Sequence, residues 1–83
     1  MAVRQIEYRG MTVKAAAFEV MGLNRFIVLV SISRRSAKRK AKFFEPPCDD
    51  GFFDDPDEGL DSAVAYARAI IDGDVPGLTV EDL

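Results

Sequence analysis

Residues 55–73 read DPDEGLDSAVAYARAIIDG, and this stretch decides the fold. Asp55 is a favourable N-cap, Pro56 suits the first helical position, and Glu58 follows Asp55 at capping-box spacing. Gly73 is a typical residue for the end of a helix. The segment therefore predicts one helix with both of its ends marked.

The interior of this segment is apolar on one side only. Its apolar residues recur three and four positions apart, which places them on a single stripe of a helix. Two alanines keep the stripe shallow, so we expect the helix to lie close on the surface that it covers. The stripe consists of Leu60, Ala63, Val64, Ala67, Ile70 and Ile71.

Four segments upstream of the helix have the composition and alternation of strands: residues 3–9, 12–20, 25–33 and 38–45. Gly10 and the stretch Met21-Gly22-Leu23-Asn24 favour tight turns between them. We expect consecutive hairpins that form an antiparallel four-stranded sheet (ββββ), with the C-terminal helix packed on one face. The predicted fold class is α+β.

The second strand shows a slip in its alternation. Phe18 and Val20 stand on the opposite phase from Val13. A β-bulge within Ala15-Ala16-Ala17 would return all three side chains to one face, so a bulge is predicted there.

The third strand is apolar on both faces. Phe26, Val28, Val30 and Ile32 form one face, and Ile27 and Leu29 form the other. The helix stripe is expected to touch Ile6, Tyr8, Val13, Phe26 or Val28, and Val30, leaving Ile27 and Leu29 on the far side. Since a strand with two apolar faces is usually covered twice, we expect self-association as a homodimer, through that far face or through an edge of the sheet.

The chain of 83 residues is expected to form one domain over residues 1–73, followed by a tail over 74–83 in which Leu78, Val80 and Leu83 could dock loosely. A domain of this size has a thin core. Cys48 is the single cysteine and histidine is absent, so an intrachain disulfide is excluded and a zinc site of the usual kind is not expected. No cofactor is expected.

Two features invite a catalytic or metal-binding interpretation. The acidic run between Asp49 and Glu58 offers carboxylates for Ca²⁺, but its spacing does not match a helix–loop–helix calcium loop, and helix capping explains its second half. Cys48 lies beside two aspartates, which disfavour a reactive thiolate. Without histidine or a glycine-rich phosphate loop, the chain is not expected to be an enzyme.

Charge is divided unevenly along the chain. Residues 1–45 hold ten Lys/Arg against three acids, a net charge of +7, whereas residues 46–83 hold one Arg against eleven acids, a net charge of −10. Six of the cations lie close together on the predicted third hairpin and could contact a phosphate backbone, with Phe43 or Phe44 stacking on a base. The alternative is a solvated edge that the acidic half neutralises in part. The six are Arg34, Arg35, Lys38, Arg39, Lys40 and Lys42.

Neither a membrane span nor a signal peptide is expected. The longest apolar run, residues 26–30, has the length of a strand, and the first five residues lack a long apolar core behind a basic start. The predicted location is the cytoplasm of a bacterial-type cell.

Three motifs carry a resemblance. Residues 6–10 read IEYRG, the acidic step Phe53-Asp54-Asp55 precedes the helix, and residues 70–73 read IIDG. With residues 16–20 (AAFEV), this chain resembles a group of short, uncharacterised bacterial proteins over about residues 6–73. The resemblance implies a small sheet-plus-helix fold with no assigned activity, and the basic hairpin and the tail are not part of that pattern.

Two functions follow as expectations. The first is a non-enzymatic protein-interaction or structural module that self-associates and has an unknown protein partner. The alternative is a nucleic-acid-binding module that uses the basic hairpin between the third and fourth strands. Four strands followed by a helix also form the unit of some dimeric single-strand nucleic-acid binders, although a fold does not fix a function.

Overall fold

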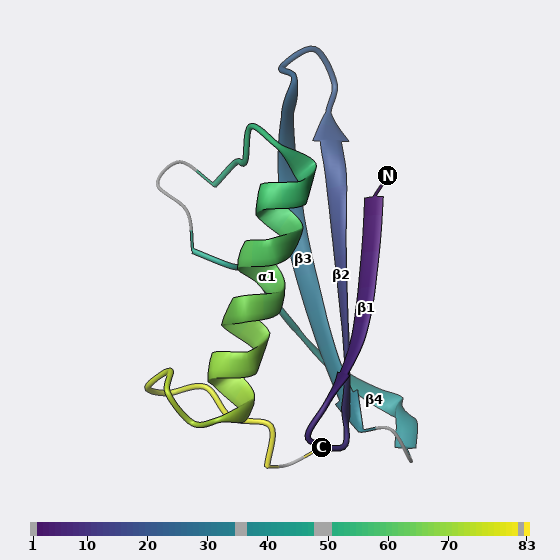
Figure 1. Cartoon of the computed structure of the whole chain (residues 1–83), viewed down its shortest axis with the longest axis vertical. Helices are drawn as coiled ribbons and strands as arrows, with labels where there is room; N and C mark the ends of the chain where they lie inside the picture. Colours follow the sequence, from purple (N-terminus) through teal and green to yellow (C-terminus); the bar gives the residue numbers. More distant parts are fainter. Residues whose placement is uncertain (1, 35–36, 48–50, 82) are drawn as a thin grey trace.

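The computed structural model describes residues 2–34, 37–47, 51–81 and 83. Its strands are β1 (Ala2–Tyr8), β2 (Met11–Val20), β3 (Arg25–Arg34) and β4 (Ala37–Phe44), and its helix is α1 (Pro56–Ile71). The strands form one antiparallel sheet in the order β1-β2-β3-β4. The helix lies across one face of this sheet (Figure 1). The α+β architecture predicted from the sequence is confirmed.

The ladder between β2 and β3 is the longest in the sheet and has no irregularity. All ten residues of β2 pair in register, from Met11 opposite Arg34 to Val20 opposite Arg25. The predicted bulge at Ala15-Ala16-Ala17 is therefore wrong. Large apolar residues of β2 instead lie on both faces of the sheet, and Phe18 lies on the face away from α1, opposite Ile27.

The sheet is irregular at β4. This strand pairs with residues 30–34 of β3, and the register shifts between Ser33 and Arg34. Farther along β3, the edge is occupied by Phe53, which exchanges two backbone hydrogen bonds with Phe26 (2.7 and 2.8 Å). The loop before the helix thus continues the edge where β4 has ended.

The core lies between α1 and the sheet. Ile32, Ile70, Val13 and Val30 are the largest fully buried side chains. Val28 is also buried, whereas its neighbour Ile27 is 40% exposed. The predicted parity of β3 is confirmed, because its even-numbered residues face the helix and pair with the buried odd-numbered residues of β2.

The ends of the helix follow the sequence signals. The Asp55 side chain accepts a hydrogen bond from the Asp57 backbone N–H (3.2 Å), Pro56 begins the helix, and Gly73 leaves it with a φ of +81°. Gly59 has a role that the sequence pattern did not reveal. A Cβ atom there would lie 2.6 Å from Cγ2 of Val28, so glycine permits the first turn of α1 to approach β3 closely.

We call residues 75–83 the C-terminal strap. Its described residues, 75–81 and 83, run from beneath the end of α1 toward the lower end of the sheet (yellow in Figure 1). Val80 is only 6% exposed and belongs to the core. The core is also contacted by three partly buried residues of the strap, Val75, Leu78 and Leu83. The described part of the strap is therefore docked on the helix side of the sheet.

Candidate functional site

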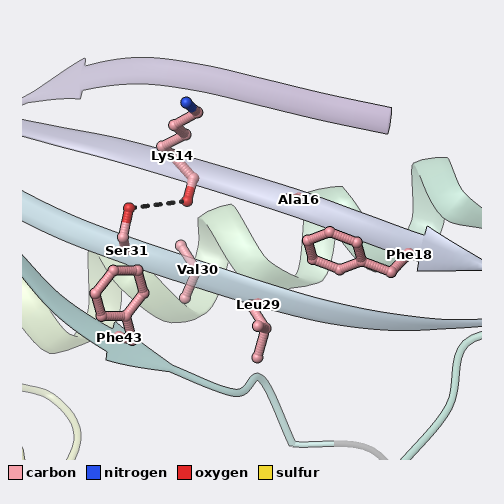
Figure 2. Close-up of a pocket in the computed structure, with 7 residues that line it drawn as sticks. All are labelled: Lys14, Ala16, Phe18, Leu29, Val30, Ser31 and Phe43. Atoms are coloured by element: carbon pink, nitrogen blue, oxygen red, sulfur yellow. Dashed lines mark hydrogen bonds between the residues drawn. The ribbon is translucent and has the colours of Figure 1, made fainter. Parts of the chain in front are cut away.

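We call the face of the sheet that is turned away from α1 the open face. One half of it is apolar. Figure 2 looks onto it, with α1 behind the strands. Phe43 is 73% exposed, Phe18 41% and Ile27 40%. Strand pairing brings the open-face residues of all four strands together, and the apolar ones include Val3, Ala16, Phe18, Ile27, Leu29 and Phe43.

A hollow of about 210 Å³ lies within the open face. The rings of Phe18 and Phe43 stand on two sides of it, Leu29 lies between them, and the small side chain of Ala16 leaves room beneath (Figure 2). Lys14 lies at the rim of the hollow. Clustered exposed apolar side chains around a hollow are the usual mark of an interaction surface rather than of a solvated sheet.

Polar residues limit the apolar half at one end. The Thr12 hydroxyl donates to both carboxylate oxygens of Glu7 (3.0 and 3.1 Å), and the Ser31 hydroxyl donates to the main-chain oxygen of Lys14 (3.4 Å). The apolar part of the open face is therefore a bounded patch that does not extend along the full length of the strands.

Both residues predicted for self-association, Ile27 and Leu29, lie on the open face. Phe18, Val3 and Phe43 also lie on this face, although the sequence pattern did not predict them there. The unexplained phase of Phe18 was the available signal, and the bulge hypothesis removed it. The direction of Phe43 depends on the irregular pairing of β4, which alternation alone does not reveal.

Several arginines of the basic half pair with carboxylates of the acidic half. Arg4 on β1 pairs with Asp61 of α1, and Arg25 Nε lies 3.0 Å from an Asp54 carboxylate oxygen. Arg9 Nε lies 3.0 Å from Asp72. The sheet is the basic half of the sequence and the loop and helix are the acidic half, so these pairs join the two layers.

One of these pairs belongs to a small cluster at the end of α1. The Tyr8 hydroxyl donates to Asp72 (2.8 Å), and the guanidinium groups of Arg9 and Arg68 lie 5.6 and 5.4 Å from the centre of the Tyr8 ring. Hydrogen bonding with Tyr8 and the nearby charge of Asp72 raise the pKa of Arg9. The cluster fastens β1 to the helix end, in agreement with a packing role for Tyr8.

Two of the described cations of the basic hairpin contact the C-terminal strap. Lys42 Nζ donates to the main-chain oxygen of Thr79 (2.9 Å), and Arg34 Nε donates to that of Leu83. Both acceptors belong to the C-terminal strap. Lys40 is exposed, whereas Arg35 and the side chains of Lys38 and Arg39 lie outside the described residues.

No group of three or more carboxylate or thiol side chains among the described residues is placed to hold a metal ion. Cys48, Asp49 and Asp50 lie outside the described part of the chain. Within the same residues, no helix is long and apolar enough to cross a membrane.

Comparison with known proteins finds no family model, no curated protein and no solved structure that matches the chain. The resemblance to short bacterial proteins stays a prediction.

Proposed function

We propose that this protein is a non-enzymatic interaction module that self-associates through the open face of its sheet. The observation that carries the proposal is a hollow between the exposed Phe18 and Phe43, with the exposed Ile27 paired beside Phe18, on a face that no described segment of the chain covers. A second copy that packs there would remove these side chains from water, which is the main driving force for protein association.

Three features favour a second copy as the occupant. An open sheet face can pack on an identical face, because sandwiched sheets stack about 10 Å apart with their side chains interdigitated. Among the described residues that line the hollow, Lys14 is the one charged side chain, so a second copy meets a mostly apolar surface there. A thin core also gains most from a second layer.

The test is the oligomeric state over a range of concentrations, measured by sedimentation equilibrium. We expect a dimer for the unaltered chain. Leu29→Asp should weaken association at least about a hundredfold, because the new carboxylate would lose its water in the interface. Ala65→Glu, which adds the same charge to an exposed position of α1, is the matched control and should leave the dimer intact. A monomer at high micromolar concentration would refute the proposal.

The second candidate function is nucleic-acid binding through the β3–β4 hairpin. The observation that favours it is the exposure of Phe43 (73%) on the same strand as the exposed Lys40, since single-strand binders combine aromatic platforms with cations. Fluorescence polarisation with random single-stranded and duplex oligonucleotides provides the test. Binding should fall steeply with salt and disappear when Arg34, Arg35, Lys38 and Lys40 are changed to Glu; a flat titration of the unaltered chain at low salt excludes this function for the hairpin as it stands.

A further inference from the structure

The two edges of the sheet differ in how well they are protected against pairing with a further strand. β4 carries Lys38, Arg39, Lys40 and Lys42 and pairs irregularly with β3, and both features are known to keep an edge from extending. β1 has no proline, no lysine and no irregularity, and all of its residues pair in register with β2. Figure 1 shows α1 beside β3 and β1 on the far side of β2, at the end of the sheet.

The two charged residues of β1 both have partners within the chain. Arg4 pairs with Asp61 of α1, and Glu7 accepts a hydrogen bond from the Thr12 hydroxyl of β2 (3.0 Å). Both partners lie toward the interior of the molecule as seen from β1. Neither charge is therefore held outward against a strand that approaches this edge.

The hydrogen bonds of the sheet show which backbone groups of β1 point outward. Phe26 exchanges its hydrogen bonds with Phe53 on the outer side of β3 (2.7 and 2.8 Å). Because successive strand residues direct their N–H and C=O groups to alternate sides, Ile27 points the other way, toward Phe18 of β2. The ladders from β3 to β1 are regular, so the odd-numbered residues of β2 bond with the even-numbered residues of β1.

The turn between β1 and β2 agrees with this phase. Arg9 and Gly10 have φ angles of +50° and +78°, as in a type I′ turn. A turn of this kind is closed by a hydrogen bond between the residues that flank it, here Tyr8 and Met11. Tyr8 therefore directs its backbone groups toward β2, as the other even-numbered residues of β1 do.

The odd-numbered residues of β1 consequently direct their N–H and C=O groups away from the sheet. These residues are Val3, Gln5 and Glu7, and all three are exposed. Among the described residues, no backbone hydrogen bond from a turn or loop reaches them. A regular edge with such a row of donors and acceptors is a template for one more strand.

We infer that β1 pairs with β1 of a second copy of this chain, antiparallel and about a two-fold axis at Gln5. Gln5 is the midpoint of β1, so this register pairs the strand over its full length. It sets Glu7 opposite Val3 and Arg4 opposite Ile6, so no like charges meet. An axis at Arg4 would set that arginine opposite its own copy, which is destabilising. An axis at Ile6 would leave the first residues of β1 unpaired.

This contact goes beyond the proposed function and does not depend on it, because the edge and the open face are different surfaces. Through the edge, two sheets join side by side into one, whereas through the open face they stack. A variant that blocks the open face therefore isolates the edge contact.

The experiment uses Leu29→Asp and begins with sedimentation equilibrium. We expect this variant to form a dimer with a dissociation constant of about 0.1 mM, weak because the contact is mostly backbone. Phe43→Asp, at a more exposed position of the open face, takes its place if circular dichroism shows that Leu29→Asp does not fold.

Hydrogen exchange of single amides, followed by NMR, identifies the contact. At about 1 mM, ten times the expected dissociation constant, about a fifth of the chains remain monomeric. The outward amides of Val3, Gln5 and Glu7 should then exchange about fivefold more slowly than at low micromolar concentration. The amides of Arg4 and Ile6, which bond with β2, should already be protected in the monomer.

Gln5→Pro in the same variant removes the central N–H group of the contact. Proline is tolerated at an edge position whose N–H group faces outward, so the fold should be retained. We expect the edge dimer to weaken about tenfold or more, because its central pair of hydrogen bonds is lost. Gln5→Ala keeps the N–H group and is the matched control. If the proline variant does not fold, Val3→Pro, at another outward position, replaces it with the same expectation.

Three results would each overturn the inference: a Leu29→Asp variant that stays monomeric at about 1 mM, outward amides that exchange equally fast at both concentrations, or a folded proline variant that dimerises unchanged. The unaltered chain, measured in parallel, reports the open-face contact. If it dimerises at low micromolar concentration while Leu29→Asp stays monomeric, the proposed function stands and the edge contact is rejected. If both form only the weak dimer with protected outward amides, the edge contact stands and the open-face contact is rejected.

Discussion

The two faces of the sheet are built from the same strands but differ in how far their apolar side chains are buried. On the helix side, Val13, Val30 and Ile32 have no exposed surface, whereas on the other side Phe18 and Ile27 remain 41% and 40% exposed. Both faces of β3 are apolar, yet only one is covered within the chain. The comparison teaches that hydrophobic composition by itself does not identify the core, because the open face has the composition of a core without its cover.

The difference has an energetic consequence. Burial of apolar surface within the chain stabilises the monomer, so substitutions on the helix side should act on folding at every protein concentration. Substitutions on the open face should act on folding only when a second molecule covers them, because binding stabilises the folded state by mass action. Concentration dependence therefore separates the two faces.

The largest effect is expected from Ile32→Ala on the helix side. Ile32 is fully buried, so removing its side chain should lower the free energy of unfolding by about 2–5 kcal/mol. The matched open-face variant, Ile27→Ala, should cost less than about 1 kcal/mol at low micromolar concentration, and more as the concentration rises. Urea unfolding followed by circular dichroism at two concentrations measures both. Equal losses for the two variants at the lower concentration would contradict the assignment of the faces.

Much of this division was predictable from the sequence. The alternation of β3 gave its parity correctly, and the caps and stripe of residues 55–73 defined the helix. Phe18 shows where alternation fails. The pattern tells which residues share a face, but not whether a second apolar face is tolerated. The bulge was inferred on the assumption that the large apolar residues of β2 belong to one face, and the regular ladder overturns that assumption.

The candidate sites were less predictable, for physical reasons. Arg34 and Lys42 are surface cations in any sequence-based interpretation, because nothing local shows that their partners are main-chain oxygens more than 35 residues away. Likewise Phe43 and Phe44 are adjacent and chemically identical, and only the pairing of Ser31 with Phe43 places one on the open face and the other toward the core. Contacts between distant segments decide these cases, and local periodicity carries no information on them.

An intermediate effect is expected from Gly59→Ala in α1. An alanine would gain about 1 kcal/mol of helix propensity, but its Cβ would lie 2.6 Å from Cγ2 of Val28 and 3.1 Å from Cγ of Phe53. Overpacking of this kind typically costs about 1–3 kcal/mol, so a net loss of stability is expected.

The control for Gly59→Ala is the reverse change at an exposed helical position, Ala65→Gly, which should cost about 1 kcal/mol through propensity alone. Thermal unfolding of both variants provides the comparison. If Gly59→Ala raises the melting temperature, the close approach of α1 to β3 is not what keeps glycine at this position.

The smallest effect, and the sharpest separation of the two faces, is expected from Asp55→Ala. The Asp55 side chain accepts from the Asp57 backbone N–H at the start of α1, so its loss should cost about 1 kcal/mol of folding free energy. Asp55→Asn keeps an acceptor and should restore most of it. Because the cap lies on the helix side, the dissociation constant of the dimer should be the same for both variants under conditions where each is fully folded. A dimer that weakens in proportion to the lost stability would mean that α1, and not the open face, forms the interface.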